Sequence, residues 1–128
     1  MNKTYNVATG IPGDLSAQVD SLKLDLTWSG HAKREAVNDR YGVLPVGSYP
    51  KQVRPVEWQL VEVETVGNGY TVSKIVVRRA VDARRSLVLV VLLDGPARNA
   101  TLGIVKTCWT NLNSDRHATL RTEKFSRP

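Results

Sequence analysis

The most constraining feature of this sequence is an unbroken apolar run from Leu87 to Leu93, LVLVVLL. A strand with one face in water alternates apolar and polar residues, whereas this segment has no polar face. The run is also far too short to span a bilayer as a helix, which takes about 20 residues. The sequence therefore predicts a strand in the centre of a sheet, with both of its faces covered.

Turn-forming residues on both sides of this run predict how the neighbouring strands are connected. Gly67, Asn68 and Gly69 tolerate positive φ and separate two β-rich segments, which indicates a hairpin. Further turns are expected over residues 81–85 and at Asp94-Gly95-Pro96. We therefore expect an antiparallel meander of about four strands, over Glu57–Val66, Tyr70–Arg79, Leu87–Leu93 and Thr101–Leu112.

One N-terminal helix is predicted before the meander and is expected to pack on a face of the sheet. Ser29 is a good N-cap, Ala32 to Arg40 are fair helix formers, and Gly42 is a natural stop. The preceding segment, Ser21 to Trp28, alternates and fits either a strand or an extended arm, and residues 1–20 are expected to be an irregular arm. The predicted class is α+β, in a single domain over residues 1–128.

Composition and charge indicate where in the cell the protein is expected and which partners it is expected to bind. The chain has 128 residues, of which 41% are hydrophobic, and its one cysteine, Cys108, has no internal disulfide partner. The N-terminus lacks the apolar run of a signal peptide, so a cytoplasmic location is expected, with no membrane partner. The net charge of +6 favours anionic partners, above all nucleic acid. The alternatives are a merely basic soluble protein and one that meets an acidic protein.

The order of elements and two short motifs resemble a known family. SGHAKREAVNDR resembles the "HA..R" helix of small toxins, and IVKTCWTN followed by DRHATL resembles the closing strand and tail of related proteins. Over residues 28–128 the chain thus resembles the BECR fold, which barnase-like, colicin-type and RelE-type ribonuclease toxins share. The resemblance implies a metal-independent endoribonuclease without cofactor, acting on RNA and neutralised by a cognate antitoxin or immunity protein. Small phage-encoded proteins also have sequences of this kind.

Four residues are candidates for cleavage of an RNA phosphodiester. Such a reaction needs a base for the 2′-hydroxyl, a cation for the phosphate and an acid for the leaving oxygen. We assign His31 and His117 to proton transfer, because the unperturbed pKa of histidine lies near 6.5. Arg34 would bind the phosphate and Thr107 would orient it. Thr107 is expected to share one strand face with Val105 and Trp109.

Each candidate also has a purely structural interpretation. His31 and Arg34 fit an ordinary solvated helix face, Thr107 is a good strand residue, and His117 fits a cap on the turn at residues 113–115.

A basic cluster is predicted around the turn over residues 81–85. Its members, expected to steer nucleic acid by its phosphates, are Arg78, Arg79, Arg84 and Arg85. Lys106, on the strand that follows, is also expected to bind nucleic acid. The structural interpretation is a solvated hairpin tip. Whether RNA is cut or only held, this cluster would set the salt dependence of binding.

Other classes of site find no support in the sequence. The chain lacks zinc-ligand spacing, a phosphate-binding P-loop motif, a base placed beside Cys108 and a carboxylate pair suited to sugar hydrolysis. No metal or cofactor is therefore expected. Three functions remain: a ribonuclease, a non-catalytic basic binding module, and a small structural subunit of a virion. Convergence of His31, Arg34, Thr107 and His117 in one cleft would favour the first.

Overall fold

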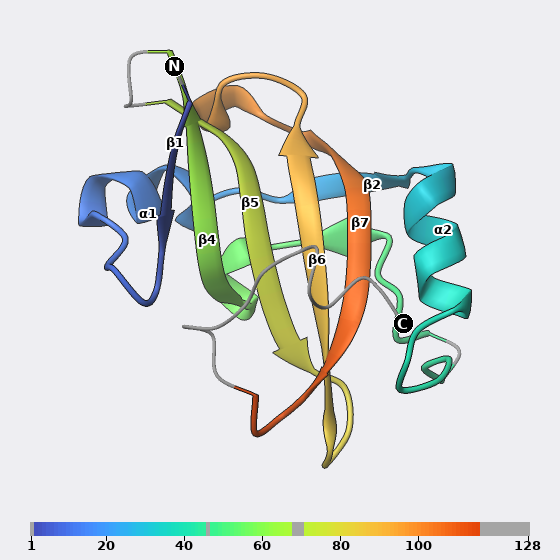
Figure 1. The fold of residues 1–128 in the computed structure, drawn as a ribbon. Helices are drawn as coiled ribbons and strands as arrows, with labels where there is room; N and C mark the ends of the chain where they lie inside the picture. The colour runs from blue at the N-terminus through green and yellow to red at the C-terminus, as the bar shows by residue number, and fades with distance from the viewer. Residues whose placement is uncertain (1, 46, 68–70, 116–128) are drawn as a thin grey trace.

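The structure is a computed structural model that describes residues 2–45, 47–67 and 71–115. Its strands form one sheet in the order β1-β4-β5-β6-β7-β2-β3, accompanied by two α-helices and two 3₁₀ turns (Figure 1). The elements are β1 (Lys3–Asn6), α1 (Gly13–Asp20), β2 (Leu24–Trp28), α2 (Gly30–Val37), β3 (Gln52–Val53), η1 (Pro55–Glu57), β4 (Gln59–Val66), β5 (Thr71–Ala80), β6 (Arg85–Leu93), η2 (Ala97–Asn99) and β7 (Leu102–Leu112).

The meander predicted from turns and apolar runs is confirmed. β4, β5, β6 and β7 follow one another as antiparallel neighbours. β6, which carries the apolar run, lies in the middle of the sheet, and Val88, Leu89 and Val91 have no exposed surface. A strand buried on both faces is what an unbroken apolar run requires.

The prediction of about four strands was too small, and the prediction of an irregular arm over residues 1–20 was wrong. β1 pairs antiparallel with β4, and α1 buries Leu15 and Val19, which lie one helical turn apart. The breakers Gly10 and Pro12 mark the connection between these two elements and do not mark a disordered segment. At the other edge, β2 runs parallel to β7, and β3 pairs with β2.

The two faces of the sheet are covered differently. One face carries the main core, to which both helices contribute side chains, including Leu15, Val19 and Ala32. We call this the helical face. The opposite face carries a smaller buried cluster made only of strand residues: Val61, Val76, Val88, Val90 and Trp109. The single packed helix that the sequence predicts is therefore one of two. Within the part of the chain that the structure describes, no helix is long and apolar enough to cross a membrane.

Helix α2 begins where the sequence predicts and ends earlier. The hydroxyl of Ser29 accepts a hydrogen bond of 3.0 Å from the backbone N–H of Ala32, which is an N-cap. The helix stops at Val37 because Asn38 donates its side-chain amide back to the carbonyl of Arg34, and Asp39 accepts from the N–H of Tyr41. Such side-chain bonds to nearby backbone compete with continued helix. The chain therefore turns before Gly42.

A β-bulge in β7 changes which side chains share a face. Val91 of β6 pairs with Val105, whereas its neighbour Val90 pairs with Thr107, so Lys106 is an extra residue without a partner. The bulge puts Val105 on the helical face and Thr107 on the opposite one. The prediction that Val105 and Thr107 share a face was therefore wrong, because a period of two holds only within an uninterrupted ladder.

Cys108 is buried under helix α2 and is expected to be chemically inert in the folded protein. Burial, with smaller contributions from Asp39 and Glu35, raises the pKa of its thiol to about 12. Because the thiolate is the reactive form, a thiol reagent at neutral pH should leave the native protein unmodified and react with one equivalent after unfolding. Mass spectrometry checks this, and rapid modification of the native protein would contradict it.

Candidate functional site

The predicted catalytic pair on helix α2 lies on an exposed surface. The side chain of His31 is 57% exposed, and its Nε2 lies 3.3 Å from Oε1 of Glu35, one turn further along the helix. Arg34 is also exposed on this helix. This arrangement is that of a solvated helix face with a side-chain contact between residues i and i+4.

Thr107 lies on the other side of the sheet from helix α2. The sulfur of Cys108 is 3.5 Å from the carbonyl oxygen of Ala32, so Cys108 points to the helix and Thr107 points away. The structure therefore does not bring His31 and Thr107 into one cleft. His117, the fourth predicted residue, lies outside the described residues.

Thr107 and Asn111 are two buried polar residues of β7, four positions apart on the face of the sheet opposite the helices. The sequence analysis did not include Asn111 among its candidates. Thr107 is 5% exposed and Asn111 is fully buried. Their side-chain polar atoms have no hydrogen-bond partner within the described ranges. An unsatisfied buried polar group costs about 1–3 kcal/mol. His31 is the one histidine among the described residues and lies on helix α2, so no imidazole in that part of the chain lies beside Thr107 or beside Asn111.

Two of the arginines predicted to bind phosphate make contacts within the protein instead. Arg78 is 4% exposed and donates to two backbone carbonyls, those of Leu112 at 2.7 Å and Asp115 at 2.9 Å. Burial lowers the pKa of Arg78, an effect that the carboxylate of Asp115 opposes. The guanidinium of Arg79 lies 4.1 Å from the ring centre of Trp58. Arg78 thus serves the fold, and Arg79 stacks on an aromatic ring.

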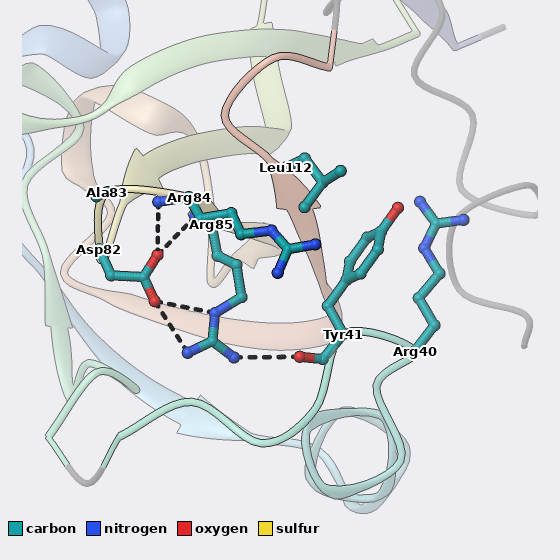
Figure 2. Close-up of a pocket in the computed structure, with 7 residues that line it drawn as sticks. All are labelled: Arg40, Tyr41, Asp82, Ala83, Arg84, Arg85 and Leu112. Atoms are coloured by element: carbon teal, nitrogen blue, oxygen red, sulfur yellow. Dashed lines mark hydrogen bonds and ion pairs between the residues drawn. The ribbon is translucent and has the colours of Figure 1, made fainter.

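The other two predicted arginines line a depression of about 560 Å³ at the turn between β5 and β6. The turn supplies Asp82, Ala83, Arg84 and Arg85, the loop after α2 supplies Arg40 and Tyr41, and the end of β7 supplies Leu112 (Figure 2). We call this the arginine pocket. Lys106, the fifth predicted ligand, is exposed but lies six residues before Leu112, about 20 Å along the strand.

Asp82 and Arg85 are joined by hydrogen bonds on one side of the arginine pocket. One oxygen of Asp82 accepts from the backbone N–H groups of Arg84 at 2.9 Å and Arg85 at 2.6 Å. The other oxygen binds the Arg85 guanidinium through Nε and Nη2, both at 2.9 Å. Nη1 of Arg85 then donates to the carbonyl of Tyr41 at 3.1 Å. This chain of bonds ties the strand turn to the loop after α2 (Figure 2).

The Asp82 carboxylate should make the stability of the protein depend on pH in the acid range. The Arg84 and Arg85 N–H groups, and then the Arg85 side chain, lower the pKa of Asp82 in the folded protein. A lowered pKa stabilises the fold above the unfolded value of about 3.9, and the effect is lost as pH falls through the folded value. Asp82→Ala should therefore unfold in less urea than wild type at neutral pH, with the gap closing in acid. A gap that stays constant with pH would contradict this.

The remaining side chains make the mouth of the arginine pocket cationic. Arg84 is exposed and its guanidinium has no ion pair or hydrogen bond within the described part of the chain. The guanidinium of Arg40 lies 4.7 Å from the ring centre of Tyr41. Among the described residues that line the pocket, the one carboxylate, that of Asp82, is bound to Arg85, and the groups that we assign to a ligand are the Arg84 guanidinium and the Tyr41 phenol. These groups can hold an anion but offer no strong general base.

Sequence reasoning identified Arg84 and Arg85 from their charge and missed Arg40 and Tyr41. The latter two are distant in sequence from the turn, and they lie beside it because hydrogen bonds of Asp39 and Arg85 fix the loop after α2.

No group of three or more histidine, cysteine or acidic residues is placed to hold a metal in the described ranges. Comparisons of the chain with protein-family models, curated proteins and solved structures find no match.

Proposed function

We propose that this protein is a non-catalytic module that binds nucleic acid by its phosphates at the arginine pocket. The observation that carries the proposal is the meeting of Arg40, Arg84 and Arg85, from two separate segments, around one depression. The net charge of +6 supplies the long-range attraction that such binding needs.

The chemistry of the pocket favours a phosphate over other ligands. A guanidinium presents its donors in a planar fork that matches two phosphate oxygens. Arg85 is already bound to Asp82, so Arg84 is the residue that we assign to the phosphate. Arg40, stacked on Tyr41, would add a second positive charge at the mouth.

A ribonuclease of toxin type remains the second proposal, from the family resemblance alone. It would need His31 or His117 as a proton-transfer group. Within the described residues, His31 is paired with Glu35 on the helix, and Thr107 lies across the sheet. Among the described residues that line the arginine pocket there is no histidine, and the one carboxylate, that of Asp82, is bound to Arg85. We therefore favour binding without cleavage.

Removing the Arg84 charge should weaken RNA binding and make it less salt-dependent. In fluorescence anisotropy with a short labelled single-stranded RNA, Arg84→Gln should raise the Kd roughly threefold to tenfold. The slope of log K against log[salt] should fall by about one. Arg54→Gln is the matched control, because Arg54 is an exposed arginine near Glu57 that does not line the pocket. Equal losses in both variants, or no RNA binding by wild type, would overturn the proposal.

The same RNA separates the rival functions. Incubation with wild type followed by gel electrophoresis should leave the RNA intact. Cleavage that disappears in His31→Ala, with the fold preserved by circular dichroism, would establish the ribonuclease instead. Absence of RNA binding at low salt, with capture by an acidic protein, would favour a protein partner.

A further inference from the structure

We infer that the arginine pocket accepts one nucleotide of a single-stranded chain, with its base on the ring of Tyr41 and its phosphate on Arg84. This inference rests on the proposed function and makes it more specific. A protein that only neutralises charge would bind single strands and duplexes alike through their backbones. A nucleotide pocket would discriminate between them.

The shape of the site is the first observation. A duplex presents its phosphates on a convex backbone, which surface arginines contact without a hollow. The arginine pocket is a depression of about 560 Å³, within the range of sites for small organic ligands. A base that is unstacked from its neighbours can enter such a hollow, whereas a paired base cannot.

The lining of the site is the second observation. Tyr41 is half-buried, with the Arg40 guanidinium on one face of its ring. Figure 2 shows Arg84 on the other side of that ring, directed toward Tyr41 and Leu112. The space between them has an aromatic wall, an apolar wall and a guanidinium. Aromatic rings are the usual platforms for single-stranded bases.

The backbone that carries the Tyr41 ring is also held in place before any ligand arrives. The Arg85 guanidinium binds the Tyr41 carbonyl, and Asp39 binds the Tyr41 N–H at 2.9 Å. Leu112 is fixed by its N–H, which donates to Asp115 at 2.9 Å. A platform fixed in this way loses little conformational entropy on binding.

Variants at Tyr41 and Arg84 test separately whether the pocket binds a phosphate and whether it also binds a base. Tyr41→Leu should weaken binding of a single-stranded RNA roughly tenfold and leave binding of the corresponding duplex unchanged. Tyr41→Phe, which keeps the aromatic face, should bind both RNAs like wild type. Arg84→Gln should weaken both. If Tyr41→Leu binds single strands like wild type while Arg84→Gln does not, the nucleotide pocket is refuted and phosphate binding stands. If wild type binds neither RNA, both proposals fail.

A competition test needs no variant and covers the case in which Tyr41→Leu fails to fold. A nucleoside monophosphate should displace the labelled single-stranded RNA from wild-type protein at a lower concentration than inorganic phosphate does. Equal potency of the two competitors would overturn the inference, because the base would then contribute nothing.

Discussion

Replacing Gly103 by valine is expected to lower the free energy of unfolding by more than about 3 kcal/mol, and replacing it by alanine by about 2 kcal/mol. A Cβ atom at Gly103 would lie 2.6 Å from Cγ1 of Val91 and 3.2 Å from Cδ2 of Leu26. Real side chains do not approach so closely, so neighbouring atoms must move. Since domains are stable by only about 5–15 kcal/mol, the valine variant should be largely unfolded at modestly raised temperature.

The surroundings of Gly103 leave little room for relief. Val91 is fully buried in the central strand, and its branched side chain has few χ1 rotamers open to it. On the other side, the parallel pairing of β2 with β7 puts Leu26 directly beside Gly103, with Leu24 also within reach. The glycine thus gives side chains of β2 and β6 the space to meet over β7. Overpacked cores respond by strain in side chains and backbone.

Urea unfolding followed by tryptophan fluorescence measures the effect at Gly103. The matched control is Gly13→Ala, because a Cβ at Gly13 meets nothing within 4 Å, and its stability should stay near that of wild type. Val91→Ala combined with Gly103→Ala should be less destabilised than the sum of the two single changes, since each vacates the volume that the other fills. Wild-type stability of Gly103→Val would contradict the close packing of Val91 and Leu26 around Gly103.

The parts of the fold that sequence reasoning reached are those determined by local chemistry. Segments that contain glycine, aspartate and proline separate the strands of the meander in the sequence, and Ser29 caps helix α2 in the position that its sequence context predicts. The unbroken apolar run indicated the central strand. Each of these features depends on residues only a few positions apart.

The parts that sequence reasoning missed depend on pairing between distant segments. β1 has four residues and becomes a strand by pairing with β4, for example Lys3 with Thr65. β2 lies parallel to β7 across most of the chain length. The bulge at Lys106 breaks an alternation that looks regular in sequence. None of these has a local signature, because tertiary pairing decides them.

The same distinction applies to the candidate site. Charge alone indicated Arg84 and Arg85, but it also indicated Arg78, whose side chain the β5 register directs to the end of β7. No sequence pattern indicated Tyr41 and Arg40 as site residues. They line the pocket because the loop after α2 brings them beside the turn. A charge pattern therefore located the region, and only the structure distinguishes arginines that hold the fold from those that face solvent.

Replacing Arg78 by methionine is expected to lower the free energy of unfolding by about 3 kcal/mol. The change removes two charge-assisted hydrogen bonds, to the carbonyls of Leu112 and Asp115, while roughly preserving the side-chain volume. These bonds hold the chain where it leaves β7. Arg78→Lys keeps the charge but not the planar fork, so it should recover only part of the loss.

The neighbouring arginine provides the control for Arg78. Arg79 is exposed and stacks on Trp58, so Arg79→Met should cost no more than about 1 kcal/mol. Urea unfolding and RNA anisotropy, measured on both variants, distinguish an arginine that stabilises the fold from one that binds RNA. If Arg78→Met keeps wild-type stability but weakens RNA binding as Arg84→Gln does, then Arg78 contacts the phosphates as its sequence position suggests. Loss of stability with unchanged affinity for RNA at low temperature would assign Arg78 to the fold and leave the phosphate to Arg84.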